Sequence, residues 1–433
     1  MNRRRFMVAA AGVFGLAALL RRLRAAETWL VRYLWSGAVT PTGARVVACL
    51  SRSAERVRWA FVADKADWKS AAFTEAIAAR PEDGNIVAFT LTGLKPATTY
   101  RYAVEVDGRL VTESPAKFTT FPETTNDVTV CFASCASTGS DHPVFDAVGN
   151  QKPAVFLHMG DFHYLDIIPA DRNRRLEGYA AVHASSTQRK LYRQVPIAYM
   201  WDDHDFLGSD SDGVAETPAQ AAAIKDARLA YQTAIPHYPL ALGAGDVPIA
   251  QAFSLGRVRF VLTDARSARL PGKTILGDAQ KKWLKDEVRA SKEKHRLFVW
   301  ISSVPWTGKA DPKADTWAGF PDERTEIADF FKAEGLAGRV CILSGDAHML
   351  AIDDGSHGDF ATGGGMPIPV FQAAALDRKG SDKGGPFSHG TKPGRGQFGR
   401  MRIKDDGTKL HVEWAGMNAD GEVVKGMEHA FTV

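Results

Sequence analysis

The chain has 433 residues, which is more than one hydrophobic core usually serves, so two or three domains are expected. Apolar residues make up 45% and charged residues 24%, which is ordinary for a soluble globular protein and excludes the disordered and collagen-like classes. A net charge of +4 is too small to indicate specific nucleic-acid recognition, although a slightly positive field favours anionic substrates.

Residues 1–26 predict an export signal. Arg3, Arg4 and Arg5 precede Phe6 and an apolar stretch at 7–20, which is too short to span a bilayer comfortably. Paired arginines before a hydrophobic residue resemble a twin-arginine signal, so we expect the export machinery to deliver the protein to the periplasm or the exterior. The alternative is a short membrane-associating helix, and without a clear cleavage site an uncleaved segment would tether the protein.

Residues 27–121 predict a β-sandwich, because short runs of alternating apolar and polar residues are separated by turn residues. The runs lie at 57–62, 86–91, 100–106 and 116–121. The stretch LTGLKPATTYRY at 91–102 places a tyrosine after a Gly and Pro corner, and it resembles the strand entry of fibronectin type III domains. The alternative is another all-β module. A polar linker at 122–127 is expected to follow.

Residues 128–433 predict an α/β layered domain, with central β-sheets flanked by helices, because apolar strands alternate with amphipathic helices. The expected strands are 128–134, 154–159, 196–201, 258–263, 296–302 and 339–344. The expected helices are 172–194, 218–234, 278–290 and 323–333. Strand-like alternation returns at 399–403, 409–414 and 429–433 around turn residues, which predicts hairpins that complete a sheet.

The four cysteines are too few and too scattered for a disulfide framework. Cys131 and Cys341 lie within apolar runs and are expected to be buried thiols. Cys135 differs, because it follows the end of an expected strand.

Nearly every apolar strand of the second domain ends in polar residues. The clusters are Ser134 and Cys135; Gly160, Asp161 and Tyr164; residues 201–205; Asp264, Arg266 and Arg269; Ser302 and Ser303; and Gly345, Asp346 and His348. Ligands of layered α/β folds bind beyond the carboxyl ends of strands, so these side chains are expected to converge on a metal site. Taken singly, Cys135 is more often a core thiol, His204 a structural histidine and WDDHD a helix cap.

Seven motifs in order resemble the calcineurin-like metallophosphoesterases, and specifically the alkaline phosphatase D or PhoD-like group. They are FASC at 132–135, HMGDFHY at 158–164, WDDHD at 201–205, TDARSAR at 263–269, LGDAQKKWL at 276–284, SSVPW at 302–306 and LSGDAH at 343–348. With the preceding sandwich and the export signal, the resemblance covers nearly the whole chain.

The resemblance implies two metal ions. The first would be bound by Cys135, Asp161, Tyr164 and His348. Asp161 would bridge to a second ion that Asp203 and Asp346 also bind. Thiolate with phenolate indicates ferric iron at the first site, whereas a carboxylate-rich second site suits calcium, or manganese, magnesium or zinc.

The resemblance also implies catalytic roles for three further residues. His204 follows an implied metal-binding carboxylate and would act as general acid toward the leaving oxygen or as an outer-shell partner. Arg266 and Arg269 would hold the phosphoryl oxygens as charge develops, the alternative being an ordinary surface ion pair.

The sequence departs from the family pattern after WDDH, where relatives commonly carry Glu and then an asparagine. Here Asp205 follows, and the nearest later acids are Asp210 and Asp212. Either aspartate is a candidate replacement for the missing amide, and a solvated turn is the alternative. Ser302 and Ser303 also stand where related two-metal hydrolases often carry a histidine.

We therefore predict a monomeric enzyme that hydrolyses phosphate monoesters or diesters of small molecules by metal-activated water. A cysteine-dependent phosphatase is disfavoured, because no arginine follows Cys135 within residues 136–142. One alternative is a phospholipase D-like diesterase that uses the same metals on phospholipid or nucleotide diesters. The other is a catalytically inactive binding protein.

Overall fold

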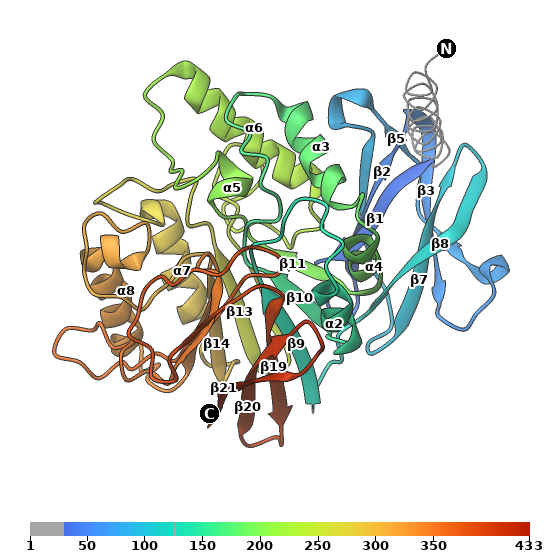
Figure 1. Ribbon diagram of the computed structural model, residues 1–433. Helices are drawn as coiled ribbons and strands as arrows, with labels where there is room; N and C mark the ends of the chain where they lie inside the picture. The colour runs from blue at the N-terminus through green and yellow to red at the C-terminus, as the bar shows by residue number, and fades with distance from the viewer. Residues whose placement is uncertain (1–29, 125–126) are drawn as a thin grey trace, which may run out of the picture.

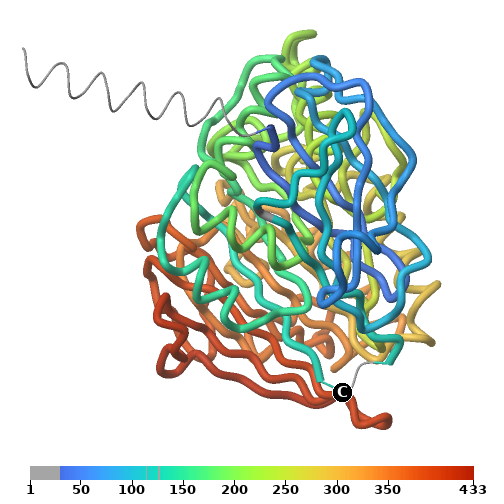
Figure 2. Tube along the Cα trace, turned by 90° about the vertical axis from the view of Figure 1, so that its right-hand side faces the viewer, coloured from blue at the N-terminus to red at the C-terminus, as the bar shows by residue number. Residues whose placement is uncertain are grey.

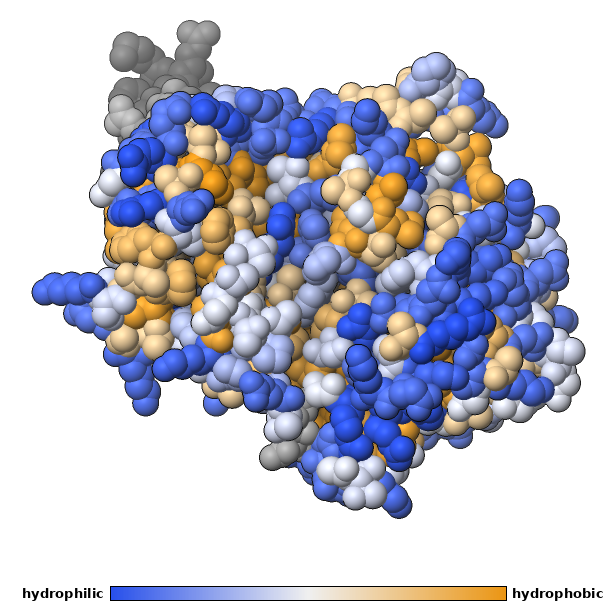
Figure 3. Space-filling model, turned by 180° about the vertical axis from the view of Figure 1, so that it is seen from behind, coloured by the Kyte–Doolittle hydropathy of each residue, from blue (hydrophilic) through white to orange (hydrophobic). Residues whose placement is uncertain are grey.

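The computed structural model describes residues 30–124 and 127–433. The export signal predicted for residues 1–26 lies outside the described residues. Within them, no helix has the length and apolar character needed to cross a membrane. On the face seen in Figure 3, hydrophobic residues lie interspersed with hydrophilic ones.

The amino-terminal part folds as two facing β-layers, as predicted. One layer contains β1 (Val31–Gly37), β2 (Ala44–Leu50) and β6 (Ile86–Leu91). The other contains β3 (Ala54–Ala63), β4 (Ala72–Phe73), β5 (Ile77–Ala79), β7 (Thr99–Val106) and β8 (Arg109–Thr119). The Tyr100 hydroxyl accepts the main-chain N–H of Lys95 at 2.9 Å, so the predicted tyrosine corner is present. Short 3₁₀ turns lie at Trp68–Ser70 and Pro81–Asp83.

The first layer of the sandwich continues into the sheet of the following part, because β1 pairs in parallel with β11 (Ile197–Tyr199) at Gly37 and Ile197. A Cβ atom on Gly37 would lie 2.4 Å from the Ile197 carbonyl oxygen, so this approach requires glycine. The resulting nine-stranded sheet has the order β21-β20-β19-β9-β10-β11-β1-β2-β6. Its remaining strands are β9 (Asp127–Ala133), β10 (Val155–His158), β19 (Gln397–Asp405), β20 (Leu410–Asn418) and β21 (Val423–Thr432).

A second sheet has seven strands in the order β12-β13-β14-β15-β17-β16-β18. They are β12 (Gln251–Leu255), β13 (Val258–Thr263), β14 (Leu297–Ser302), β15 (Val340–Ser344), β16 (Met349–Asp353), β17 (Val370–Ala373) and β18 (Thr391–Pro393). The two sheets pack face to face: the Phe371 ring of β17 lies 5.0 Å from that of Phe132 on β9 and 5.4 Å from that of Trp414 on β20.

Helices cover the outer faces of the paired sheets, which confirms the layered α/β prediction. In Figure 1, α7 (Gly277–Ser291) and α8 (Pro321–Ala333) lie on the side of β13 and β14, while α2 (Val144–Asn150) and α4 (Ser186–Gln194) lie on the side of β9 and β10. The other helices of the described residues are α3 (Arg172–Val182), α5 (Asp203–Phe206), α6 (Pro218–Ala234) and a 3₁₀ turn at Trp317–Gly319. Figure 2 shows the carboxyl-terminal strands at the opposite edge from the amino-terminal ones.

The single helix expected at residues 172–194 is two helices. Helix α3 ends at Val182, and the Ser185 hydroxyl caps α4 by accepting the Gln188 N–H at 3.1 Å. An internal serine therefore starts a new helix where the apolar periodicity alone predicts one continuous helix.

Candidate metal centre

The predicted convergence at the strand ends is present, and it draws on both sheets. Cys135 and Asp161 follow β9 and β10 of the nine-stranded sheet, while Asp346 and His348 follow β15 of the other. The Gly-Asp pairs need glycine for a steric reason. A Cβ atom on Gly160 would lie 2.4 Å from Cβ of Asp202, and one on Gly345 would lie 2.7 Å from the Ser134 hydroxyl.

The four residues predicted to bind the first metal lie together and form the first cluster: Cys135, Asp161, Tyr164 and His348. Donor atoms of Cys135, Asp161 and His348 all lie within 4.8 Å of one another. The Tyr164 hydroxyl donates to Oδ2 of Asp161 at 2.6 Å and lies 3.3 Å from Nε2 of His348. Sγ of Cys135 lies 3.4 Å from the same Asp161 oxygen.

Backbone strain accompanies this arrangement. Cys135, Asp161 and Asp346 have φ angles of 63°, 55° and 64°, in the left-handed region that side-chain-bearing residues rarely adopt. Such conformations cost about 1–3 kcal/mol each and persist where the surrounding structure enforces them, often at functional sites. The fold therefore stabilises three unfavourable backbone conformations at the residues that bring donor atoms together.

The charge balance of the first cluster fits a bound cation. Burial, together with the nearby Asp203, Asp202 and Asp205 carboxylates, raises the pKa of Asp161 well above its ordinary value. Oδ1 of Asp161 is buried without a hydrogen-bond partner among the described residues. A cation at this position would stabilise the ionised carboxylate and satisfy that oxygen.

The remaining donors of the first cluster fit a transition metal. Burial, aided by Asp161, raises the pKa of the Cys135 thiol well above its ordinary value, and a metal would favour the thiolate instead. Nδ1 of His348 lies 2.7 Å from the main-chain oxygen of Lys379, which orients the ring and leaves Nε2 facing the cluster.

The residues predicted for a second metal are brought together only in part. Donor atoms of Asp161, Asp203 and His204 lie within 4.8 Å of one another, so Asp161 joins both groups. Asp346 is held differently, because its Oδ1 accepts from the Lys383 ammonium at 2.8 Å, while its Oδ2 has no hydrogen-bond partner among the described residues. We call Asp203, Asp210 and Asp346, together with the shared Asp161, the second cluster.

Of the two candidate replacements for the family's asparagine, Asp210 lies beside Asp203. Its N–H donates to Oδ2 of Asp203 at 2.7 Å, and its carboxylate forms a compact group with those of Asp203 and Asp315. Asp212 instead accepts the Val214 N–H at 2.9 Å in a local turn. Ionisation of Asp203 is opposed by burial, but Arg266, His204 and the Asp210 N–H outweigh it and lower its pKa to about 2.

Ser303 donates from its hydroxyl to Oδ1 of Asp202 at 2.9 Å, so this serine orients the residue before Asp203. The Ser302 hydroxyl donates to the Val304 carbonyl and accepts from the Trp317 indole. Both serines are buried.

His204 lies over the first cluster. Its Nδ1 is 2.6 Å from the Asp166 carboxylate, and its ring centre lies 4.1 Å from that of Tyr164. A carboxylate at Nδ1 fixes the ring orientation, which suits a proton donor and equally an outer-shell partner.

Arg266 and Arg269 are not surface residues, so the alternative of a surface ion pair is wrong. Their exposures are 0% and 2%. Nε of Arg266 donates to Asp202 at 2.5 Å, and both guanidinium groups pair with Asp315. The Nη2 atom of each arginine has no hydrogen-bond partner among the described residues.

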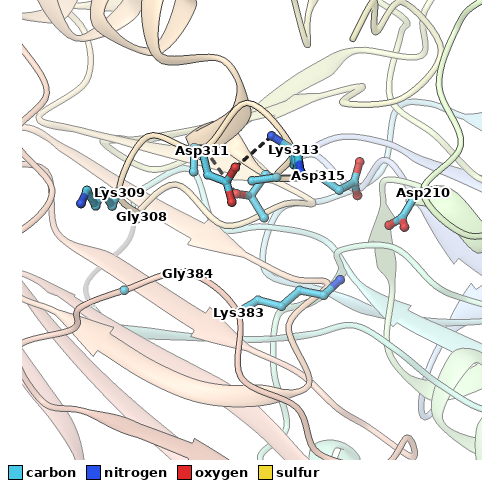
Figure 4. A pocket seen from close by; sticks show the side chains of 12 residues that line it. Asp210, Gly308, Lys309, Asp311, Lys313, Asp315, Lys383 and Gly384 are labelled. Atoms are coloured by element: carbon cyan, nitrogen blue, oxygen red, sulfur yellow. Dashed lines mark hydrogen bonds between the residues drawn. The ribbon is translucent and has the colours of Figure 1, made fainter. Parts of the chain in front are cut away.

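A cavity of about 510 Å³ borders the second cluster. Asp210, Asp315 and Lys383 line it, and Figure 4 shows the Lys383 amino group directed toward the side where Asp210 lies. Sequence patterns do not reveal Asp315 and Lys383, because neither follows a strand or belongs to a recognised motif. The basic, glycine-rich run DRKGSDKGG at 377–385 is the signal that would have indicated a cationic loop.

Comparison with known proteins finds relatives of this chain. The alkaline phosphatase D of Bacillus subtilis (strain 168) is 23% identical over 319 residues, which are 62% of this chain. The match spans about half of that relative, 54% of its length. A solved structure titled "Structure of PhoD" superposes with a TM-score of 0.76 at 17% identity, covers 94% of this chain and 90% of its own, and shares the fold.

The sequence profile described as PhoD-like phosphatase matches residues 130–384, which is more than half of the chain and includes both clusters. This chain therefore belongs to the PhoD-like phosphatase family.

Proposed function

We propose that this protein hydrolyses phosphate esters with two bound cations. The observation that carries the proposal is the convergence of Cys135, Asp161 and His348, with Tyr164 hydrogen-bonded to Asp161. Thiolate, phenolate and imidazole suit a transition metal, and we propose ferric iron at the first cluster. The carboxylates of the second cluster suit a harder cation, and we propose calcium there.

The bound cations would activate the attacking water and neutralise phosphoryl charge. The protein's own side chains orient the reactants and donate the proton to the leaving group. Asp161 shares one carboxylate between the clusters, while Asp166 holds the His204 imidazole for proton donation to the leaving oxygen. Arg266 fixes Asp202, and through it the start of α5, which carries Asp203.

We also propose that residues 1–26 export the protein by the twin-arginine route. This route carries folded proteins, so a transition metal would be loaded before export. The consecutive arginines Arg3, Arg4 and Arg5 before an apolar stretch support the proposal. Fusing residues 1–26 to a reporter that is active only after export tests it, and a reporter that stays in the cytoplasm would contradict it.

Replacement of Asp161 tests the catalytic proposal directly. Asp161→Ala removes the carboxylate shared by both clusters and should lower hydrolysis of chromogenic phosphate esters by about 1,000-fold or more. Asp212→Ala is the matched control, because Asp212 caps only a local turn and its loss should leave activity within about twofold. Comparable activity in Asp161→Ala and wild-type protein would contradict the proposal.

The same assay separates the ester classes. Parallel reactions with a monoester and a diester of the same chromogenic alcohol give kcat/KM for each. A diester preference would favour the phospholipase D-like alternative, while hydrolysis of neither ester by metal-loaded protein would favour the binding protein.

A further inference from the structure

Arg378 is a cationic side chain at the candidate metal centre that no described acidic residue neutralises. Its guanidinium carbon lies 3.8 Å from the centre of the Tyr164 ring. Within residues 30–124 and 127–433, no hydrogen bond or ion pair engages this guanidinium. The neighbouring cations are occupied, since Lys383 pairs with Asp346 and Arg395 pairs with Asp377.

The main chain around Arg378 is fastened to the first cluster at several points. The N–H groups of Leu376 and Asp377 donate to the carbonyl oxygens of Ser134 and Cys135 at 3.0 and 3.1 Å. The Lys379 carbonyl oxygen lies 2.7 Å from Nδ1 of His348. Arg378 therefore stands between residues that contact two of the proposed ligands, and its position is fixed relative to them.

Tyr164 connects Arg378 to the reacting region. The Tyr164 hydroxyl contacts Asp161 and His348, while its ring contacts the guanidinium. Arg378 is half-buried, so a solute can reach it, whereas Arg266 and Arg269 are buried, with exposures of 0% and 2%. A planar guanidinium with unused N–H groups is suited to bidentate binding of phosphate oxygens.

We propose that Arg378 donates hydrogen bonds to a phosphoryl oxygen of the bound ester, the role that the sequence suggested for Arg266 and Arg269. The inference rests on the proposed phosphoesterase function and assigns its phosphate-binding residue. Arg266 and Arg269 act instead as positioning residues, which hold Asp202 and Asp315 from within the protein.

Two variants of Arg378 test this assignment, with Lys392→Gln as a control that removes one positive charge from the exposed surface of β18. Arg378→Ala should lower kcat/KM for a chromogenic monoester by about 100-fold, as loss of one transition-state donor does elsewhere. Arg378→Lys should recover part of that loss. Added guanidinium ion should raise the activity of Arg378→Ala and leave wild type unchanged.

Two further readouts separate phosphate binding from support of the metal ligands. Arg378→Ala should bind inorganic phosphate about tenfold more weakly by calorimetry, while elemental analysis gives the wild-type metal content. Wild-type phosphate affinity in Arg378→Ala, or a loss of activity matched by a loss of metal, would overturn the assignment. If wild-type protein hydrolyses no ester, the proposed function fails, and phosphate calorimetry still decides the role of Arg378.

Discussion

The first and second clusters balance their negative charge in different ways. In the first cluster, Cys135, Asp161, Tyr164 and His348 contact one another, and no described Lys or Arg forms an ion pair with Asp161. In the second, Lys383 pairs with Asp346, and main-chain N–H groups of His204 and Asp210 donate to Asp203.

This difference has a chemical consequence. Buried, unneutralised acids favour their protonated forms, so the first cluster reaches its ionised state only with a cation. Asp203 and Asp346 of the second cluster already have protein donors, so a cation there replaces existing interactions. We therefore expect a tightly held ion in the first cluster and an exchangeable ion in the second.

The largest effect is expected where one substitution disrupts both clusters. Gly160 precedes Asp161 and touches Asp202, the residue before Asp203, and its φ is 105°. Gly160→Ala places Cβ 2.4 Å from Cβ of Asp202, so the free energy of unfolding should fall by about 3 kcal/mol, and activity should be lost.

Gly272→Ala is the matched control for that prediction. Gly272 also has positive φ, 67°, but no atom lies within 4 Å of the position that an added Cβ atom would take. Its substitution should cost only about 1 kcal/mol, with activity retained. Thermal unfolding of both variants makes the comparison, and equal destabilisation would show that the close approach at Gly160 is unimportant.

A substitution confined to the first cluster should reduce activity less than Gly160→Ala does. Cys135→Ser replaces a soft thiolate donor, so the transition-metal content should fall and activity should drop by about 100-fold. Cys131→Ser makes the same change on β9 in the core, and it should lower stability without altering metal content. Equal metal content in the two variants would contradict the assignment of Cys135 as a ligand.

One substitution in the second cluster should strengthen cation binding instead of weakening it. Burial lowers the pKa of Lys383, but the nearby Asp346 carboxylate outweighs burial and raises this pKa, so the ammonium stays beside that carboxylate. Lys383→Met frees Asp346 and should tighten calcium binding by about tenfold in a titration. Lys313→Met removes an exposed cation from the same cavity and should change the affinity less than about twofold. Weaker binding in Lys383→Met would show that the ammonium does not compete with the cation.

The smallest effect is expected at Asp210, one of two candidate replacements for the family's asparagine. Asp210 is exposed, and its carboxylate is one of several in the second cluster. Asp210→Asn replaces this carboxylate by an amide and should change calcium affinity only about threefold, in proportion to one exposed charge. A complete loss of calcium binding in the titration would mean that Asp210 is a principal ligand.

Much of the fold follows from local patterns. Thr217 and Pro218 mark the start of α6, and the predicted and observed helix both span Pro218–Ala234. The short strands β16, β17 and β18 were missed, because their pairing joins residues distant in sequence and leaves little local periodicity. Likewise, nothing in the sequence indicates that β1 extends the sheet through Gly37.

Some residues of the candidate site could likewise be predicted from the sequence, and others could not. Cys135, Asp161 and His348 could be predicted because they follow strands whose carboxyl ends meet. Partners such as Asp315, Lys383 and Arg378 come from loops, where only the tertiary structure determines which side chains face the site. The burial of Arg266 and Arg269 was missed for the same reason, because their acidic partner Asp315 lies in such a loop.

The most direct test of the difference between the two clusters is dialysis of purified, metal-loaded protein against a calcium chelator, followed by elemental analysis and an ester hydrolysis assay. We expect about one transition-metal ion per chain to stay bound while calcium leaves. Activity should fall on dialysis and return when calcium is added. Loss of both metals together, or full activity in metal-free protein, would contradict the account.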